Sequence, residues 1–210
     1  MTAGNKEKRV VLVMSSVDEM GFSGKQSGTW FTELPAPDYI LTEAGYHVVF
    51  ASPEGGAALI DLLSMNASFI LEYAERVFND PVAMFAAQNT RKLREVDCTS
   101  DDALFVPGGY GLLWDLASDG YTLKMTREFD RSDRPVAMAG HVPAILRDVK
   151  LSTGECLVNG IEEGGFVTGQ IPASAPPLAK ALRSRLAASR KRLVQHHAPA
   201  FDDTDTAAEK

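Results

Sequence analysis

The chain has 210 residues, of which 45 % are hydrophobic and 23 % are charged, as in one globular domain of ordinary size. Its formal net charge is −7 at pH 7. This acidity argues against nucleic acid and anionic membranes as partners, because both are themselves polyanions. We therefore expect the partner to be a small molecule or another protein.

The cysteines and the N-terminal region bear on compartment and metal content. Cys98 and Cys156 are the two cysteines of the chain, and they lack the spacing of metal ligands or of a disulfide framework. The first apolar run, residues 10–14, is much too short for a signal peptide core or a membrane span. We therefore expect a cytoplasmic protein with no targeting segment, no zinc site and no other bound metal.

Apolar runs and helical segments alternate along the first two thirds of the chain. A helix is expected within 29–44, where Pro35 and Pro37 imply a kink or a late start, and Gly45 ends it. Residues 61–93 have helical composition without clear boundaries. Short apolar runs rich in β-branched residues predict buried strands at 10–14, 46–51, 103–106 and 135–139. Helices are expected after the third of these strands, around 113–117 and 121–129.

This alternation predicts an α/β fold with a doubly wound, mainly parallel sheet and helices on both faces. Ligands bind such sheets at the carboxyl ends of the strands, so the candidate site lies where Ser15, Gly108 and Gly140 converge. Beyond residue 146 the elements become shorter. We expect brief strands at 156–158 and 165–168 and a terminal helix at 173–188, which make a single domain of residues 1–189 followed by a polar, disordered tail, 190–210.

Five sequence blocks occur in an order that points to a known family. They are "VLVMSSVDEMG", "GTWFTELPAPDYILTEAGYHVVFASPEGG", "ALFVPGGYGLLWDLA", "RPVAMAGHVPAIL" and "FVTGQIPASA". Together they resemble the ThiJ/PfpI superfamily of class I glutamine amidotransferase-like domains, in its glyoxalase III and chaperone-like branch. The resemblance covers residues 10–182. It implies a flavodoxin-like fold, a tendency to form homodimers, and a cysteine on a strained elbow, next to a histidine and facing a glutamate of the first helix.

Carried onto this sequence, the resemblance assigns two of the three site residues and departs from the third. Glu33 stands at the position of the family's glutamate, and His141 at that of its histidine. Gly140 stands where the family has its cysteine, which removes the thiolate that attacks the substrate. After Asn159 a stretch of several dozen residues is missing, and with it the place where many members supply an acidic partner to the histidine.

A glycine at the elbow keeps the turn although it deletes the nucleophile. The strained conformation costs other residues about 1–3 kcal/mol and costs glycine little. Amide groups at Gly109, Gly140 and His141 are candidate oxyanion donors. Residues 107–111, "PGGYG", lack the lysine of a P-loop and fit a tight turn better than a phosphate cradle.

Glu33, enclosed by aromatic residues, is the candidate acid or base, because a desolvated carboxyl group is suited to proton transfer. The alternative is a glutamate on a helix surface. For His141, catalysis stands against a hydrogen-bonding role at a helix start. Trp30, Tyr110 and Trp114 are candidate walls of the substrate site; for the last two the alternative is core packing.

Three functions follow. The first is a cofactor-independent enzyme, of lyase, isomerase, hydratase or cyclase type, that acts on a small carbonyl compound through Glu33 and forms no covalent intermediate. The second is a pseudoenzyme with a binding, chaperone-like or stress-response role. The third, glyoxalase III or deglycase activity, is disfavoured by Gly140, because loss of a covalent nucleophile costs several orders of magnitude in rate.

Overall fold

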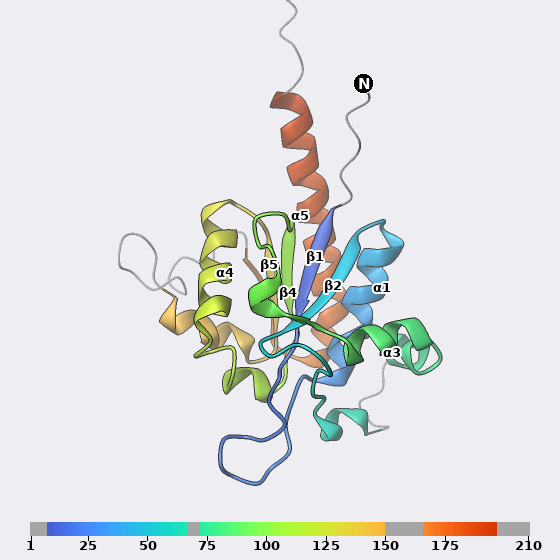
Figure 1. Ribbon diagram of the computed structural model, residues 1–210. Coiled ribbons are helices and arrows are strands. Elements are labelled where there is room, and N and C mark those ends of the chain that lie inside the picture. The colour runs from blue at the N-terminus through green and yellow to red at the C-terminus, as the bar shows by residue number, and fades with distance from the viewer. Residues whose placement is uncertain (1–7, 67–71, 150–165, 197–210) are drawn as a thin grey trace, which may run out of the picture.

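The computed structural model describes residues 8–66, 72–149 and 166–196 (Figure 1). Its centre is a parallel sheet in the order β3-β2-β1-β4-β5-β6. Apart from the two-residue edge strand β3, the order matches that of flavodoxin-like sheets. The predicted α/β class and parallel sheet are confirmed. The strands are β1 Arg9–Val13, β2 His47–Ser52, β3 Arg91–Lys92, β4 Ala103–Val106, β5 Val136–Ala139 and β6 Phe166–Gly169.

Helices cover both faces of this sheet. Alternate residues of β1 point to opposite faces: Val10 and Leu12 belong to the core under α1 and α5, whereas Val11 and Val13 belong to the core under α4. The α-helices and the shorter 3-10 turns are α1 Pro35–Glu43, α2 Glu72–Phe78, α3 Pro81–Gln88, α4 Gly120–Arg131, α5 Ala175–His196, η1 Phe31–Glu33, η2 Leu62–Met65, η4 Leu93–Glu95, η5 Gly111–Leu113, η6 Val142–Asp148 and η8 Pro172–Ser174.

The start of the first helix is the feature that positions the site. The predicted helix over 29–44 begins late, with Pro35 as its first residue, a position where proline's missing N–H is tolerated. The three residues ahead of Leu34 form the separate turn η1. Glu33 therefore lies in a 3-10 turn and not in the first α-helix, and this places it close to the ends of the strands.

Three elements differ from the prediction. The strand β3 was not predicted, because two charged residues do not give an apolar run. The region 61–93 divides at Pro81, which begins α3. The final helix α5 continues to His196, so the predicted tail starts too early; residues 189–196 include no glycine or proline to stop the helix. The predicted strand at 156–158, with Cys156, and residues 197–210 lie outside the described residues.

The predicted strand at 165–168 is found as β6, which pairs with β5 through Ala139 and Gly169. Across the described part of the chain, no helix is long and apolar enough to span a membrane.

Candidate functional site

The carboxyl ends of β1, β4, β5 and β6 face the same edge of the sheet, at the bottom in Figure 1. Of the three residues predicted to converge here, Gly108 and Gly140 do meet: a Cβ atom on Gly140 would lie 3.5 Å from the Cα atom of Gly108. Ser15 is buried behind them. Its amide donates to Thr29 Oγ1 at 2.8 Å and its hydroxyl to Asp115 at 3.0 Å, so it holds the surrounding loops together.

A cavity of about 200 Å³ opens at this edge, and we call it the Glu33 cavity. The segments that follow β1, β4, β5 and β6 each contribute to its wall. The residues that line it are Trp30, Glu33, Gly109, Tyr110, Gly140, His141, Gln170 and Pro172. The structure thus brings together most of the predicted site residues.

Glu33 is almost completely buried, with 2 % of its surface exposed. Its Oε2 atom accepts a hydrogen bond from the amide of Gly108 at 2.6 Å. A Cβ atom on residue 108 would come within 2.6 Å of the same oxygen. The glycine is therefore required by the close approach of the carboxyl group, and the pair fixes where the carboxyl group points.

Burial raises the pKa of Glu33 from 4.5 to about 7, and the hydrogen bond from Gly108 opposes part of that rise. Both protonation states are thus populated near neutral pH. A carboxyl group with such a pKa can accept and return a proton under the same conditions. This environment supports the acid/base interpretation and excludes the alternative in which Glu33 lies on a helix surface.

Gly140 keeps the backbone of an elbow, with φ at 55°, a conformation that L-residues with side chains rarely adopt. A Cβ atom here would lie 3.7 Å from Glu33 Oε1, an ordinary contact distance. The prediction that the Gly140 amide is an oxyanion donor needs correction, because this amide donates to the carbonyl of Gly169 at 2.6 Å. The turn that follows β5 aims it at β6 and away from the cavity.

The amides of Gly109 and His141 remain as candidate donors, since neither donates to another described residue. The imidazole of His141 is exposed and stacks on Tyr110, with ring centroids 4.9 Å apart. It caps no helix, because no side-chain capping bond is made at the start of η6. Within the described residues, no carboxylate forms an ion pair with it.

The three aromatic residues predicted as walls of the substrate site occupy different places in the structure. Trp30 and Tyr110 line the Glu33 cavity. Trp114 does not: it is 51 % exposed, and its indole lies against Gly21 in the loop after β1. Trp114 is the residue that follows the turn η5.

Gln170 and Pro172 line the cavity but were not among the predicted site residues. Both follow β6, and the motif "TGQIPAS" after a predicted strand was the signal that could have found them. Cys98 is buried as a free thiol and does not line the cavity. No group of three or more His, Cys, Asp or Glu side chains in the described regions is arranged to hold a metal ion.

Comparisons with known proteins agree with this architecture. The chain is 30 % identical over 148 residues to the glutathione-independent glyoxalase hsp3102 of Schizosaccharomyces pombe, which covers 69 % of this chain and 61 % of that protein. The match thus spans less than two thirds of the relative's length. No family model matches the chain.

Solved structures share the fold at lower identity. The 24 kDa rapid encystment protein of Francisella tularensis superposes with a TM-score of 0.75 at 22 % identity, over 85 % of this chain and 99 % of its own. Glyoxalase III of Candida albicans gives 0.73 at 21 % identity, over 85 % and 97 %. The sequence match to the yeast glyoxalase supports the predicted assignment to the ThiJ/PfpI superfamily, and these solved structures show that the chain shares their fold.

Proposed function

We propose that this protein is a cofactor-independent enzyme that moves a proton on a small carbonyl compound, with Glu33 as the acid/base group and no covalent intermediate. The observation that carries the proposal is the buried Glu33 carboxyl, whose pKa of about 7 is suited to proton transfer at neutral pH. Gly140 supplies no side chain to attack a carbonyl.

The chemistry requires only proton and electron-pair movements. The Glu33 carboxylate removes a proton from the carbon next to the carbonyl, and the electron pair of the C–H bond moves onto the carbonyl oxygen as an enolate. The amides of Gly109 and His141 stabilise that oxygen, each contributing about 2.7–4 kcal/mol in comparable oxyanion holes. In the isomerisation of an α-hydroxy carbonyl compound, the hydroxyl proton passes to the enolate oxygen, Glu33 returns its proton to the former carbonyl carbon, and the new carbonyl forms on the adjacent carbon. In a lyase reaction the enolate re-forms the carbonyl, a double bond forms between the α and β carbons, the bond between the β carbon and the leaving group breaks, and Glu33 protonates the leaving group.

The dimensions of the Glu33 cavity restrict the substrate class. Its volume of about 200 Å³ is below the roughly 300–1,000 Å³ of sites for drug-sized ligands. A carbonyl compound of a few carbon atoms fits this space, with the rings of Tyr110 and His141 against one side.

Names of relatives support carbonyl chemistry in general terms. One matched relative is named a glutathione-independent glyoxalase, and one structural neighbour is glyoxalase III. A route through a cysteine at the elbow is unavailable in this chain, because residue 140 is glycine. We therefore place the activity among non-covalent lyases, isomerases, hydratases or cyclases.

The test is proton NMR in D₂O on a panel of small α-hydroxy and dicarbonyl compounds, with wild type, Glu33→Gln and the matched variant Glu43→Gln. Glu43 makes the same carboxylate-to-amide change at the exposed end of α1. We expect Glu33→Gln to slow hydrogen exchange or conversion by about 10²–10⁴-fold, and Glu43→Gln to match wild type. Turnover that survives intact in a folded Glu33→Gln protein contradicts the proposal.

The competing function is that of a pseudoenzyme, a binding, chaperone-like or stress-response protein on the same fold. The glycine at the elbow favours it, since that residue deletes the group that family members use for attack. Silence of both wild type and Glu33→Gln across the panel would support this second function.

A further inference from the structure

A second, larger cavity lies on the other side of the turn η1. Its volume is about 390 Å³, within the range of small-molecule sites. Trp30 and Glu33 line the Glu33 cavity, whereas Phe31 and Leu34 line this one, and the two sets of lining residues share no member. We call it the apolar cavity.

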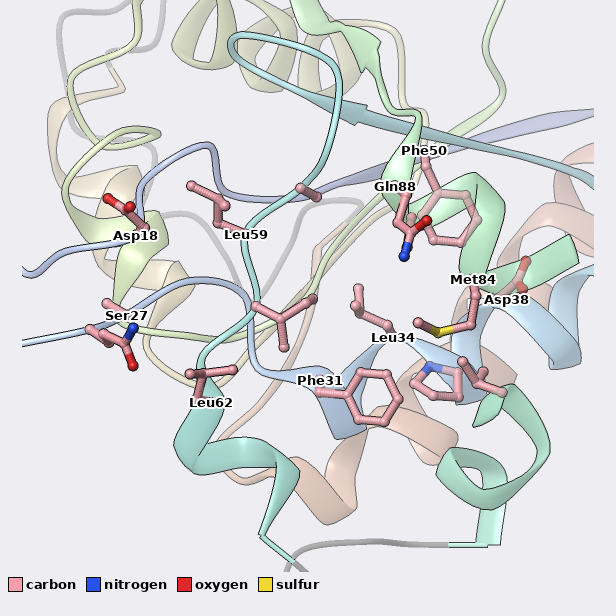
Figure 2. A pocket seen from close by; sticks show the side chains of 16 residues that line it. Asp18, Ser27, Phe31, Leu34, Asp38, Phe50, Leu59, Leu62, Met84 and Gln88 are labelled. Atoms are coloured by element: carbon pink, nitrogen blue, oxygen red, sulfur yellow. The ribbon is translucent and has the colours of Figure 1, made fainter. Parts of the chain in front are cut away.

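Apolar side chains from elements far apart in the sequence form most of its wall (Figure 2). The turn η1, the strand β2, the segment 58–62 and the helix α3 each contribute to it. The principal contacts for a ligand are Phe31, Leu34, Phe50, Ile60, Met84 and Ala87. A wall of this kind binds a hydrophobic body through the area it removes from water.

Ser27 provides an unpaired polar group in this wall. Its side chain is 2 % exposed, and its hydroxyl makes no hydrogen bond. A buried hydroxyl without a partner costs about 1–3 kcal/mol, a cost that a bound polar group would remove. In Figure 2 Ser27 and Asp38 lie at opposite ends of the cavity.

The ionisable residues that line the cavity are acidic. They are Asp18 and Asp38, and no lysine, arginine or histidine belongs to the lining. Burial raises the pKa of Asp38 to about 6; the Thr42 hydroxyl opposes this rise, and the nearby Asp80 carboxylate adds to it. A positive charge beside Asp38 would relieve both the burial cost and the repulsion from Asp80, whereas a negative charge would add to them.

Arg76 is a basic group in contact with the helix that carries Asp38. It pairs with Glu43 at 2.8 Å and lies over the Tyr39 ring, 4.0 Å from its centroid. It is not among the lining residues, so it does not occupy the cation's place.

We propose that the apolar cavity binds a small hydrophobic amine, with the ammonium group beside Asp38, the apolar body against Phe31 and Met84, and a polar substituent within reach of the Ser27 hydroxyl. This site is separate from the Glu33 cavity and does not depend on its chemistry.

Isothermal titration calorimetry of the full chain at pH 7.5 tests it with three probes of one skeleton: 1-naphthylmethylamine, 1-naphthylmethanol and 1-naphthaleneacetate. We expect the amine to bind about tenfold more tightly than the alcohol, and the carboxylate to bind most weakly. Asp38→Asn should bring the amine down to the affinity of the alcohol and leave the alcohol unchanged.

A cavity-filling variant checks the location independently of charge. Ala87→Phe should abolish binding of the amine and the alcohol, whereas Val82→Phe, on the exposed side of the same helix with 77 % of the residue accessible, should bind as wild type does. Glu33→Gln should also leave binding unchanged. Three results would overturn the proposal. The carboxylate could bind as tightly as the amine or more tightly, the affinity for the amine could be unchanged in Asp38→Asn, or no probe could bind at millimolar concentration.

Discussion

The two cavities lie on opposite sides of a single 3-10 turn and are built on different physical principles. In the Glu33 cavity a carboxyl group is held at 2.6 Å by the amide of Gly108, a residue where a Cβ atom has no room. In the apolar cavity most of the wall is hydrophobic side chains, and the acidic residues Asp18 and Asp38 lie at opposite ends. Phe31 and Glu33 are thus only two residues apart in the chain, yet they line different cavities.

This difference indicates what each cavity can do. Hydrogen bonds to the backbone fix an atom within a few tenths of an ångström, as acid/base chemistry requires. Side chains such as Met84 and Leu34 adapt to the shape of a ligand. We therefore expect the Glu33 cavity to fail when a single methyl group is added, and the apolar cavity to tolerate changes that conserve volume.

The largest expected effect comes from Gly108→Ala. Its methyl group would displace the Glu33 carboxyl and break its hydrogen bond with the residue 108 amide, so turnover should fall about 100-fold for a stability loss of about 1–3 kcal/mol. Gly120→Ala, where a Cβ atom meets nothing within 4 Å, is the control and should behave as wild type in both assays. Binding of the amine probe should survive in both variants; equal turnover in both would break the contrast between the cavities.

The second effect is a pH dependence of stability. Because the folded pKa of Glu33 is about 7 and its ordinary value 4.5, the unfolded chain releases this proton first as pH rises. Wild type therefore loses stability between pH 4.5 and 7. The stability of Glu33→Gln does not change over this range. Its free energy of unfolding should therefore exceed that of wild type by about 3 kcal/mol at pH 8, and the two should differ little at pH 4.

Urea denaturation at both pH values measures this difference. Asp38→Asn, in the apolar cavity, should also become more stable than wild type as pH rises. The change should occur at lower pH, between 3.8 and about 6, because burial raises the pKa of Asp38 only to about 6. If the difference in the free energy of unfolding between wild type and Glu33→Gln stays constant with pH, then Glu33 is not desolvated in the folded protein.

The third effect concerns the elbow. Gly140→Ala and Gly45→Ala both put a side chain at positive φ, 55° and 81°, and each should cost about 1–2 kcal/mol. Only the first places a methyl group 3.7 Å from Glu33, so only the first should lower turnover, by about tenfold. Melting curves of the two variants measure the backbone strain, and their turnover rates measure the loss of space beside Glu33. Full activity of Gly140→Ala would show that substrate does not use the room beside residue 140.

The smallest effect concerns the aromatic wall. Tyr110→Ala removes the stack on His141 and should raise KM about two- to tenfold, whereas Trp114→Ala should leave KM unchanged because Trp114 lies outside the Glu33 cavity. Steady-state kinetics on both variants decides this. A rise in KM for Trp114→Ala would restore its predicted role as a wall.

The sequence was sufficient for the parts of the site that depend on strand ends. Apolar runs located β1, β4 and β5, and the residues that follow parallel strands must meet at one edge of the sheet. Gly109 follows one of those strands closely, whereas Glu33 and His141 were singled out by the resemblance of their motifs to the ThiJ/PfpI superfamily. Trp114 and the Gly140 amide could not be placed in this way, because the direction of a side chain or of an N–H group after a turn is set by the turn's own geometry.

By itself, the sequence determined the α/β class, the order of the main elements and the absence of a side-chain nucleophile at residue 140, which is glycine, since these follow from local hydrophobic pattern and residue identity. Only the tertiary structure decided that Glu33 leaves the first helix for a 3-10 turn and reaches the Gly108 amide. The apolar cavity also exists only in the tertiary structure, because Phe31, Phe50 and Met84 come together only when α3 packs beside η1 and β2. Contacts between distant segments depend on how whole elements pack, and no local pattern encodes that.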